Sequence, residues 1–126
     1  MDNNNDGKYL SDNIYESNCP LLYALDIVGK KWKLPIMWHL ALDEKTRYNE
    51  LKRNIKGITN MMLTKSLKEL EEHKLITRTQ YESIPPKVEY SLTERGKALL
   101  PALNELTVWG KEQMRLDEGI MTKEKP

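Results

Sequence analysis

A helix that begins after Thr59 would carry one polar and basic face, made of Asn60, Met61, Thr64, Lys65 and Lys68. Its opposite face would be apolar, with leucines at i, i+4 and i+7, which are Leu63, Leu67 and Leu70. Amide and hydroxyl groups hydrogen-bond base edges, whereas ammonium groups pair with phosphates without reading sequence. We therefore interpret the polar face as a surface for the DNA major groove. Asn60, Met61 and Thr64 would meet bases, and Lys65 and Lys68 would meet phosphates.

Two further cations flank this helix in the sequence. Arg47 lies before the preceding helix and Lys87 lies just after a Pro-Pro pair, and we expect both to contact phosphates. The whole chain has a net charge of +1, yet residues 45–97 carry twelve Lys/Arg against seven Asp/Glu, or +5. This concentration of positive charge is typical of a phosphate-binding surface. A solvated, lysine-rich surface is the alternative interpretation of the charge.

Cys19 is the other residue with chemistry of its own, because it directly precedes Pro20 at a predicted helix start. The unpaired N–H groups and the positive dipole end of a helix favour thiolate over thiol, so Cys19 is a candidate redox or electrophile sensor. A small buried hydrophobic residue is the alternative, and the sequence leaves both open. With one cysteine in the sequence, an internal disulfide is excluded.

No pattern in the sequence predicts an enzyme, a metal site or a cofactor. His39, His73 and Cys19 are the only soft metal ligands, and they lack ligand spacing. Gly29-Lys30 resembles the end of a phosphate loop, but the pattern requires Gly where Ala24 stands and Ser or Thr where Lys31 stands.

The elements that must position these residues form a helix-turn-helix followed by a hairpin. We predict a helix over 49–55 with Asn49 as its N-cap, a turn over 56–58 and a second helix from Thr59. Extended runs follow over 75–83 and 88–92, separated by Pro85-Pro86. The run 46–48 would add a short strand to this wing. The fold class is mainly α with a small antiparallel β wing, a winged helix-turn-helix.

The rest of the chain divides into three parts. We predict a flexible N-terminal arm over 1–17, one domain over 18–115 and a flexible C-terminal tail over 116–126. Helices would begin at Pro20 and Trp32, and a last helix would run over 94–115. The sequence has neither a long apolar run nor a signal-peptide pattern, so we expect a cytoplasmic protein without a membrane segment.

The predicted last helix is wider in its apolar face than one small domain needs. The residues concerned are Leu99, Leu103, Leu106 and Trp109. A face of this width usually covers both its own core and another subunit, which predicts a homodimer. The alternative is that the last helix covers only the core of its own chain.

Several motifs together resemble the HxlR family of small bacterial winged helix-turn-helix transcription regulators, which are similar in architecture to MarR proteins. The motifs are Cys19-Pro20, Gly29-Lys30-Lys31-Trp32, Arg47-Tyr48-Asn49-Glu50-Leu51, Gly57-Ile58-Thr59, Met62-Leu63-Thr64, Leu67-Lys68-Glu69-Leu70-Glu71 and the wing motif from Pro85 to Thr93, with Gly96 and Trp109. The resemblance covers residues 19–109. In two places the chain departs from the pattern, with Lys74 where Gly is common and Lys87 where Arg is common.

The resemblance implies a sequence-specific regulator that binds double-stranded DNA at a palindromic operator. It implies a homodimer built from the first and last helices, in which Leu21 and Leu25 would meet the last helix of the partner. It also implies that some members sense oxidants or electrophiles through a cysteine placed as Cys19 is.

A winged-helix protein–protein adaptor is the alternative from another class. Exposed lysines on the polar face argue against it, and only Met61 suits either interpretation. Nothing in the sequence identifies a small-molecule inducer, an operator or the sign of regulation.

Overall fold

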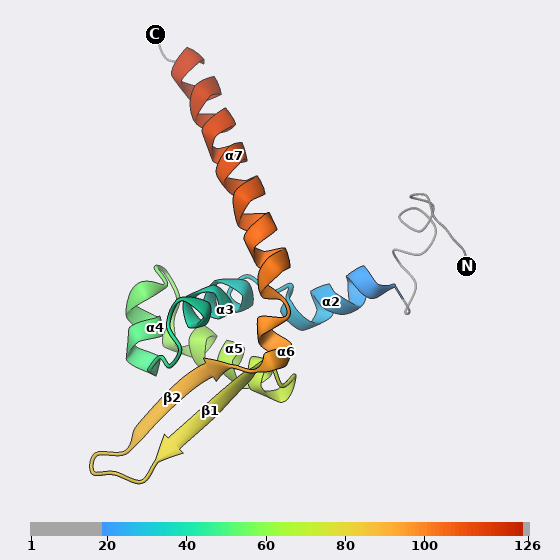
Figure 1. Cartoon of the computed structure of the whole chain (residues 1–126). Coiled ribbons are helices and arrows are strands. Elements are labelled where there is room, and N and C mark those ends of the chain that lie inside the picture. Colours follow the sequence, from blue (N-terminus) through green and yellow to red (C-terminus); the bar gives the residue numbers. More distant parts are fainter. Residues whose placement is uncertain (1–18, 125–126) are drawn as a thin grey trace.

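The helix-turn-helix and the hairpin lie at one end of the molecule, and a long helix projects from the other (Figure 1). The computed structural model describes residues 19–124, so the predicted arm over 1–17 lies outside the described residues. The elements are α2 (Pro20–Val28), α3 (Lys33–Leu42), α4 (Tyr48–Asn54), α5 (Asn60–Glu72), β1 (Ile76–Tyr81), β2 (Lys87–Leu92), α6 (Glu94–Lys97) and α7 (Leu100–Glu124). The predicted winged helix-turn-helix is confirmed.

The turn between α4 and α5 depends on one glycine. Gly57 has φ of 87°, a left-handed conformation that L side chains rarely adopt, and Ile58 next to it is buried. Thr59 then caps α5, because its Oγ1 accepts a hydrogen bond from the Met62 N–H at 3.1 Å. The predicted apolar face of this helix, made of Leu63, Leu67 and Leu70, is buried throughout.

The far end of α5 turns into the wing through a left-handed lysine. Lys74 has φ of 63°, and its N–H donates to the Glu71 carbonyl at 2.9 Å. The Leu75 N–H reaches back to the Leu70 carbonyl at 3.0 Å. These two bonds form a Schellman motif, whose left-handed position usually holds glycine. The chain therefore makes the turn without the residue that would make it easily.

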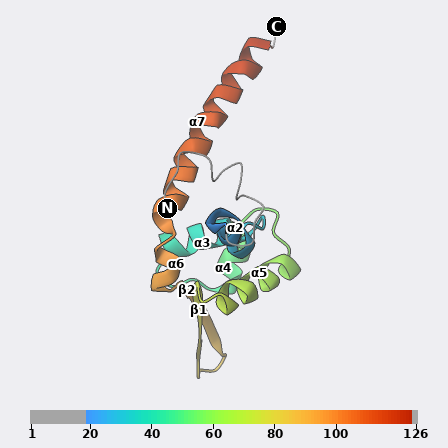
Figure 2. The ribbon, with the colours of Figure 1, turned by 90° about the vertical axis from the view of Figure 1, so that its right-hand side faces the viewer.

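The wing is a two-stranded antiparallel sheet in which Ile76 pairs with Leu92 and Arg78 pairs with Tyr90. Thr46 adds a bridge to the second strand, since it exchanges backbone hydrogen bonds with Tyr90 at 3.0 and 2.8 Å. The strand predicted over 46–48 is therefore reduced to a one-residue bridge, because Arg47 is the N-cap of α4 and Tyr48 is its first residue. Figure 2 shows the hairpin extending beyond the helices, with α5 beside its base.

The core lies where α3, α4, α5, the wing and the start of α7 meet. Its completely buried side chains include Ile36, Met37, Leu51, Leu63 and Leu70. Within the described residues, none of the helices is long and apolar enough to cross a membrane.

Two helix boundaries differ from the sequence prediction. The N-cap of α4 is Arg47 and not Asn49, because the Glu50 carboxylate accepts the Arg47 backbone N–H at 3.0 Å and closes the first turn. The single helix expected over 94–115 is instead two helices, and the second continues to Glu124. Residues 116–124 are therefore helical, so the predicted flexible tail does not begin at residue 116.

Candidate nucleic-acid interface

The polar face of α5 is fully presented to solvent. Its five predicted residues are all exposed, namely Asn60, Met61, Thr64, Lys65 and Lys68. Met61 has 80% of its surface accessible, which is unusual for an apolar side chain. The structure thus brings the predicted base-reading and phosphate-binding residues of this helix together on one surface.

The Tyr48 hydroxyl, which the sequence did not single out, lies against this surface. Its oxygen lies 3.1 Å from the Asn60 side-chain oxygen and 3.1 Å from the Thr64 hydroxyl. It is also 3.1 Å from the Asn60 main-chain carbonyl. Tyr48 is the first residue of α4, and its ring packs on the core. A side chain of the first helix therefore contacts two predicted base-reading residues of the second.

A hollow of about 230 Å³ lies between α5 and β1, with cations on both sides. Lys68 contributes from the helix and Arg78 from the strand, while Glu71 adds one carboxylate to the lining. Sequence reasoning did not assign Arg78 a role in DNA binding. Its spacing in the sequence could have indicated this position. Arg78 lies two residues after the inward-facing Ile76, so both side chains are on the same face of the strand and Arg78 points toward α5.

The two flanking cations occupy different settings. Arg47 is exposed and immediately precedes Tyr48 at the start of α4. Lys87 begins β2 at the wing, where its ammonium lies 3.6 Å from a Glu89 carboxylate oxygen and 5.1 Å from the Tyr81 ring centroid. The Lys87 ammonium therefore already has a carboxylate and an aromatic ring as partners within the wing. Among the described residues, Lys65 and Lys68 form no salt bridge.

A buried lysine holds the inner side of α5 in place. Lys33, only 2% exposed, donates from Nζ to the Ile27 carbonyl at 2.8 Å and lies 3.0 Å from a Glu69 carboxylate oxygen. The hydrogen bond from Lys33 lowers the pKa of Glu69, with smaller contributions from the charges of Lys30 and Lys65. One side chain thus joins the end of α2, the start of α3 and the last turn of α5.

The predicted dimer residues divide into exposed and buried ones. Leu21, Leu25 and Leu106 are about half exposed, and Trp109 is 63% exposed. Leu103 differs, because it is 5% exposed and belongs to the core of its own chain. Its burial leaves little surface for a partner, so Leu103 is better assigned to the core than to an interface. Leu99 is partly buried against the same core.

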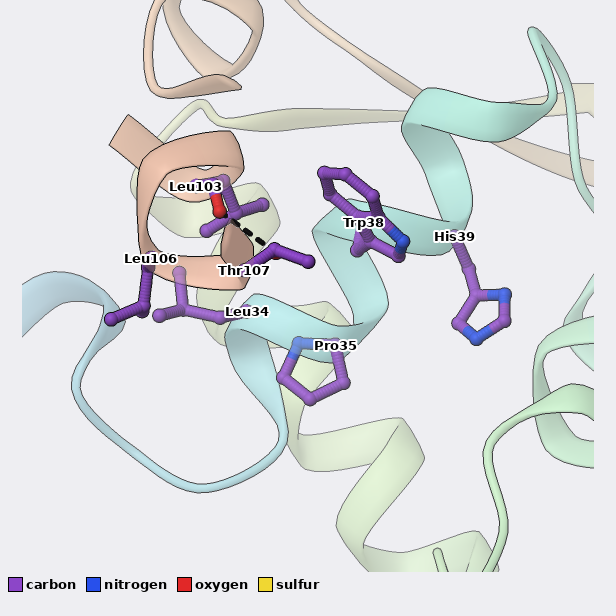
Figure 3. A pocket seen from close by; sticks show the side chains of 7 residues that line it. All are labelled: Leu34, Pro35, Trp38, His39, Leu103, Leu106 and Thr107. Atoms are coloured by element: carbon purple, nitrogen blue, oxygen red, sulfur yellow. Dashed lines mark hydrogen bonds between the residues drawn. The ribbon is translucent and has the colours of Figure 1, made fainter. Parts of the chain in front are cut away.

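An apolar pocket of about 430 Å³ adjoins the exposed part of α7 (Figure 3). Leu34, Pro35, Trp38 and His39 line it from α3, and Leu103, Leu106 and Thr107 line it from α7. The Thr107 hydroxyl does not offer a free donor there, because it bonds the Leu103 carbonyl at 2.9 Å. The uncovered apolar surface of α7 is therefore continuous with a concave apolar surface on α3.

Cys19 is the N-cap of α2, as its position before Pro20 predicted. Its side chain makes no capping hydrogen bond, and it is 4% exposed. The burial agrees with the small-hydrophobe interpretation, and the helix-end position agrees with the sensor interpretation.

A helix-turn-helix with an exposed polar second helix and a following hairpin is the winged helix-turn-helix architecture, which many DNA-binding transcription regulators share. The model of the HxlR-like helix-turn-helix family matches residues 27–118, and the chain belongs to that family. The similar proteins are described as transcriptional or redox regulators.

Three similar proteins illustrate the relationship. BH0655 of Halalkalibacterium halodurans, an uncharacterized HTH-type transcriptional regulator, is 50% identical over 91 residues, covering 72% of this chain and 80% of BH0655. The redox regulator HypR in its oxidized form is 44% identical with a TM-score of 0.71, covering 75% of this chain and 96% of HypR. The reduced form of the transcriptional regulator YodB of Bacillus subtilis is 35% identical with a TM-score of 0.65, covering 75% of this chain and 92% of YodB.

Proposed function

We propose that this transcription regulator binds DNA sequence-specifically, as a homodimer on a palindromic operator. The observation that carries the proposal is the exposed face of α5, where Asn60 and Thr64 lie beside Lys65 and Lys68. Asn60, Met61 and Thr64 would contact base edges in the major groove. Lys65, Lys68, Arg47 and Lys87 would contact phosphates, and the hollow beside β1 adds Arg78 to this set.

Salt dependence tests the DNA-binding part. Operators are first selected from a random duplex pool, and affinity is then measured across salt concentrations. Lys87→Ala and Arg78→Ala should each weaken binding to all sequences alike and lower the log–log salt slope by about one unit. Lys111→Ala is the matched control, because this exposed lysine lies on α7, away from α5 and the wing. A wild-type protein without a steep salt slope would instead be an adaptor for proteins.

The homodimer is supported by the apolar side chains that one chain leaves uncovered. These lie on α2 at Leu21 and Leu25, and on α7 at Leu106 and Trp109. Burying one leucine completely contributes about 1.5–3 kcal/mol. A twofold dimer would place two copies of α5 about 34 Å apart, one DNA turn, or a multiple of that.

Sedimentation tests the assembly. Leu106→Asp should give a folded monomer that no longer binds an operator tightly, because Leu106 is half exposed within one chain. Leu42→Asp is the control, since Leu42 is 70% exposed and lies at the end of α3, outside the proposed interface. A wild-type chain that sediments as a monomer at micromolar concentration would contradict the dimer.

A thiol-sensing role for Cys19 is a second candidate, favoured by its helix-end position and by the similarity to the redox regulator HypR. With one cysteine per chain, oxidation would either join two Cys19 residues across the dimer or form a mixed disulfide between Cys19 and a small thiol. In both cases two thiols release two electrons and two protons, which diamide takes up to become a hydrazine. The new bond would tether the α2 helices or add bulk to them, and so change the spacing of the α5 helices.

Operator binding with and without diamide tests this role. Wild type should change its affinity or its spacing preference, and Cys19→Ser should not. If both proteins respond equally, or neither responds, Cys19 is a structural residue of α2.

A further inference from the structure

The Tyr48 hydroxyl donates its single proton toward Asn60. The main-chain oxygen and the side-chain oxygen of Asn60 each lie 3.1 Å from the hydroxyl, and neither carries a proton, so Tyr48 is the donor in both contacts and shares its proton between them. The contact with Thr64, at 3.1 Å, must therefore use the proton of the Thr64 hydroxyl. The chain of donors runs from Thr64 to Tyr48 to Asn60.

The direction of these hydrogen bonds decides which donor and acceptor groups of Asn60 and Thr64 remain available to bond a DNA base. The Asn60 side-chain oxygen lies against the Tyr48 hydroxyl, so the NH2 group of the amide points away from that hydroxyl and is left as a donor. Thr64 has given its proton to Tyr48, so its oxygen offers lone pairs as an acceptor. Both residues are exposed on α5, one turn apart. Without the Tyr48 hydroxyl, the Asn60 amide can turn over and the Thr64 hydroxyl can donate as well as accept.

We propose that Tyr48 is a specificity-determining positioning residue, which makes Asn60 a donor and Thr64 an acceptor toward base edges. Asn60 then prefers the acceptor-bearing N7 or O6 of purines or O4 of thymine, and Thr64 prefers the amino group of adenine or cytosine. The inference rests on the proposed DNA binding and adds a residue from α4 that need not touch DNA itself. Its ring remains fixed by core packing, so the hydroxyl can be removed alone.

The test uses the full-length Tyr48→Phe variant and a set of operators with every single base-pair change. At the base pairs read by Asn60 and Thr64, discrimination should fall about three- to tenfold, the size expected for losing one orienting hydrogen bond. Affinity for unrelated duplexes and the melting temperature should stay at wild-type values. Tyr23→Phe, which removes a hydroxyl from an exposed tyrosine on α2, is the matched control and should bind as wild type does.

A double variant shows whether Tyr48 acts through Asn60. Adding Tyr48→Phe to Asn60→Ala should cost no further discrimination at the base pair that Asn60 reads. The proposal fails if Tyr48→Phe discriminates as wild type does. It fails equally if that variant loses affinity for all sequences alike, because Tyr48 would then contact phosphate. A wild-type protein without sequence preference would overturn the proposed function itself, which is a distinct result.

Discussion

The pair formed by Lys33 and Glu69 should respond unequally to removal of its two partners. The Lys33 side chain is 3% exposed and the Glu69 side chain is 24% exposed, while their charged atoms lie 3.0 Å apart. Glu69→Gln leaves an ammonium group buried without a carboxylate, whereas Lys33→Met leaves a carboxylate that water can reach. Lys30, at 3.9 Å, also remains beside Glu69.

The magnitudes follow from that difference in burial. Removing one partner from a fully buried pair costs about 3–5 kcal/mol. Glu69 is partly exposed and glutamine keeps an acceptor oxygen near Lys33, so we expect about 2 kcal/mol for Glu69→Gln. This loss lowers Tm by about 8 °C for a chain of this length. Lys33→Met should cost less, about 1 kcal/mol, because methionine fills a similar volume and carries no charge to desolvate, so that the main loss is the hydrogen bond to the Ile27 carbonyl.

Urea unfolding at one fixed protein concentration measures both variants, since assembly contributes to the apparent stability. The double variant should be no less stable than Lys33→Met alone. If Lys33→Met costs as much as Glu69→Gln, burial of the ammonium does not decide the energetics, and this reasoning is refuted.

Three other perturbations test separate features. Lys33 lowers the pKa of Glu69 from its ordinary 4.5. The stabilisation from their pair is therefore complete above pH 4.5 and disappears as the pH falls through the lower pKa of the folded state. The free energy of unfolding should fall more steeply with pH below 4.5 for wild type than for Glu69→Gln. Lys74→Gly should stabilise the fold by about 0.5–1 kcal/mol in denaturant unfolding, since it removes a left-handed side chain, and a loss of stability would show that the lysine makes a compensating contact. Gly96→Ala should destabilise by about 1–3 kcal/mol, because a Cβ there would lie 2.2 Å from the Leu75 carbonyl oxygen, whereas Gly119→Ala, with nothing within 4 Å, is the control and should not destabilise.

The periodic features of the chain were predictable from sequence. Leucines at helical spacing placed the buried face of α5, and alternation through Val88, Tyr90 and Leu92 placed β2. The boundary errors came from competing local signals. Asn49 is a better capping residue than Arg47, yet the Glu50 carboxylate closes the turn two residues earlier. Beyond Arg115 the residues are polar enough for a tail, but they also have adequate helix propensity.

The contacts between distant segments were not predictable. Tyr48 and Thr64 are 16 residues apart, and nothing in the local pattern of either predicts that their hydroxyls meet. The burial of Lys33 was not predictable either, because lysine is seldom buried without a partner and its partner, Glu69, lies on another helix. Leu103 and Leu106 lie on the same apolar face of the last helix, so the sequence does not distinguish them. The packing of α3 buries Leu103 in the core and leaves Leu106 about half exposed.

The first helix has a consequence for how the molecule comes to be folded. α2 has nine residues, and among them only Val28 is buried. Isolated helices shorter than about 12–15 residues are marginal in water, so α2 depends on neighbours for its helical state. The end of α2 packs on its own chain through Ile27 and Val28, but in the proposed dimer the neighbours of Leu21 and Leu25 belong to the other subunit, so the ordering of the first turns of α2 becomes part of the association step. Its amide hydrogens should then exchange faster on dilution. The abundance of the regulator, and not the subunit alone, would decide how much of its first helix is formed.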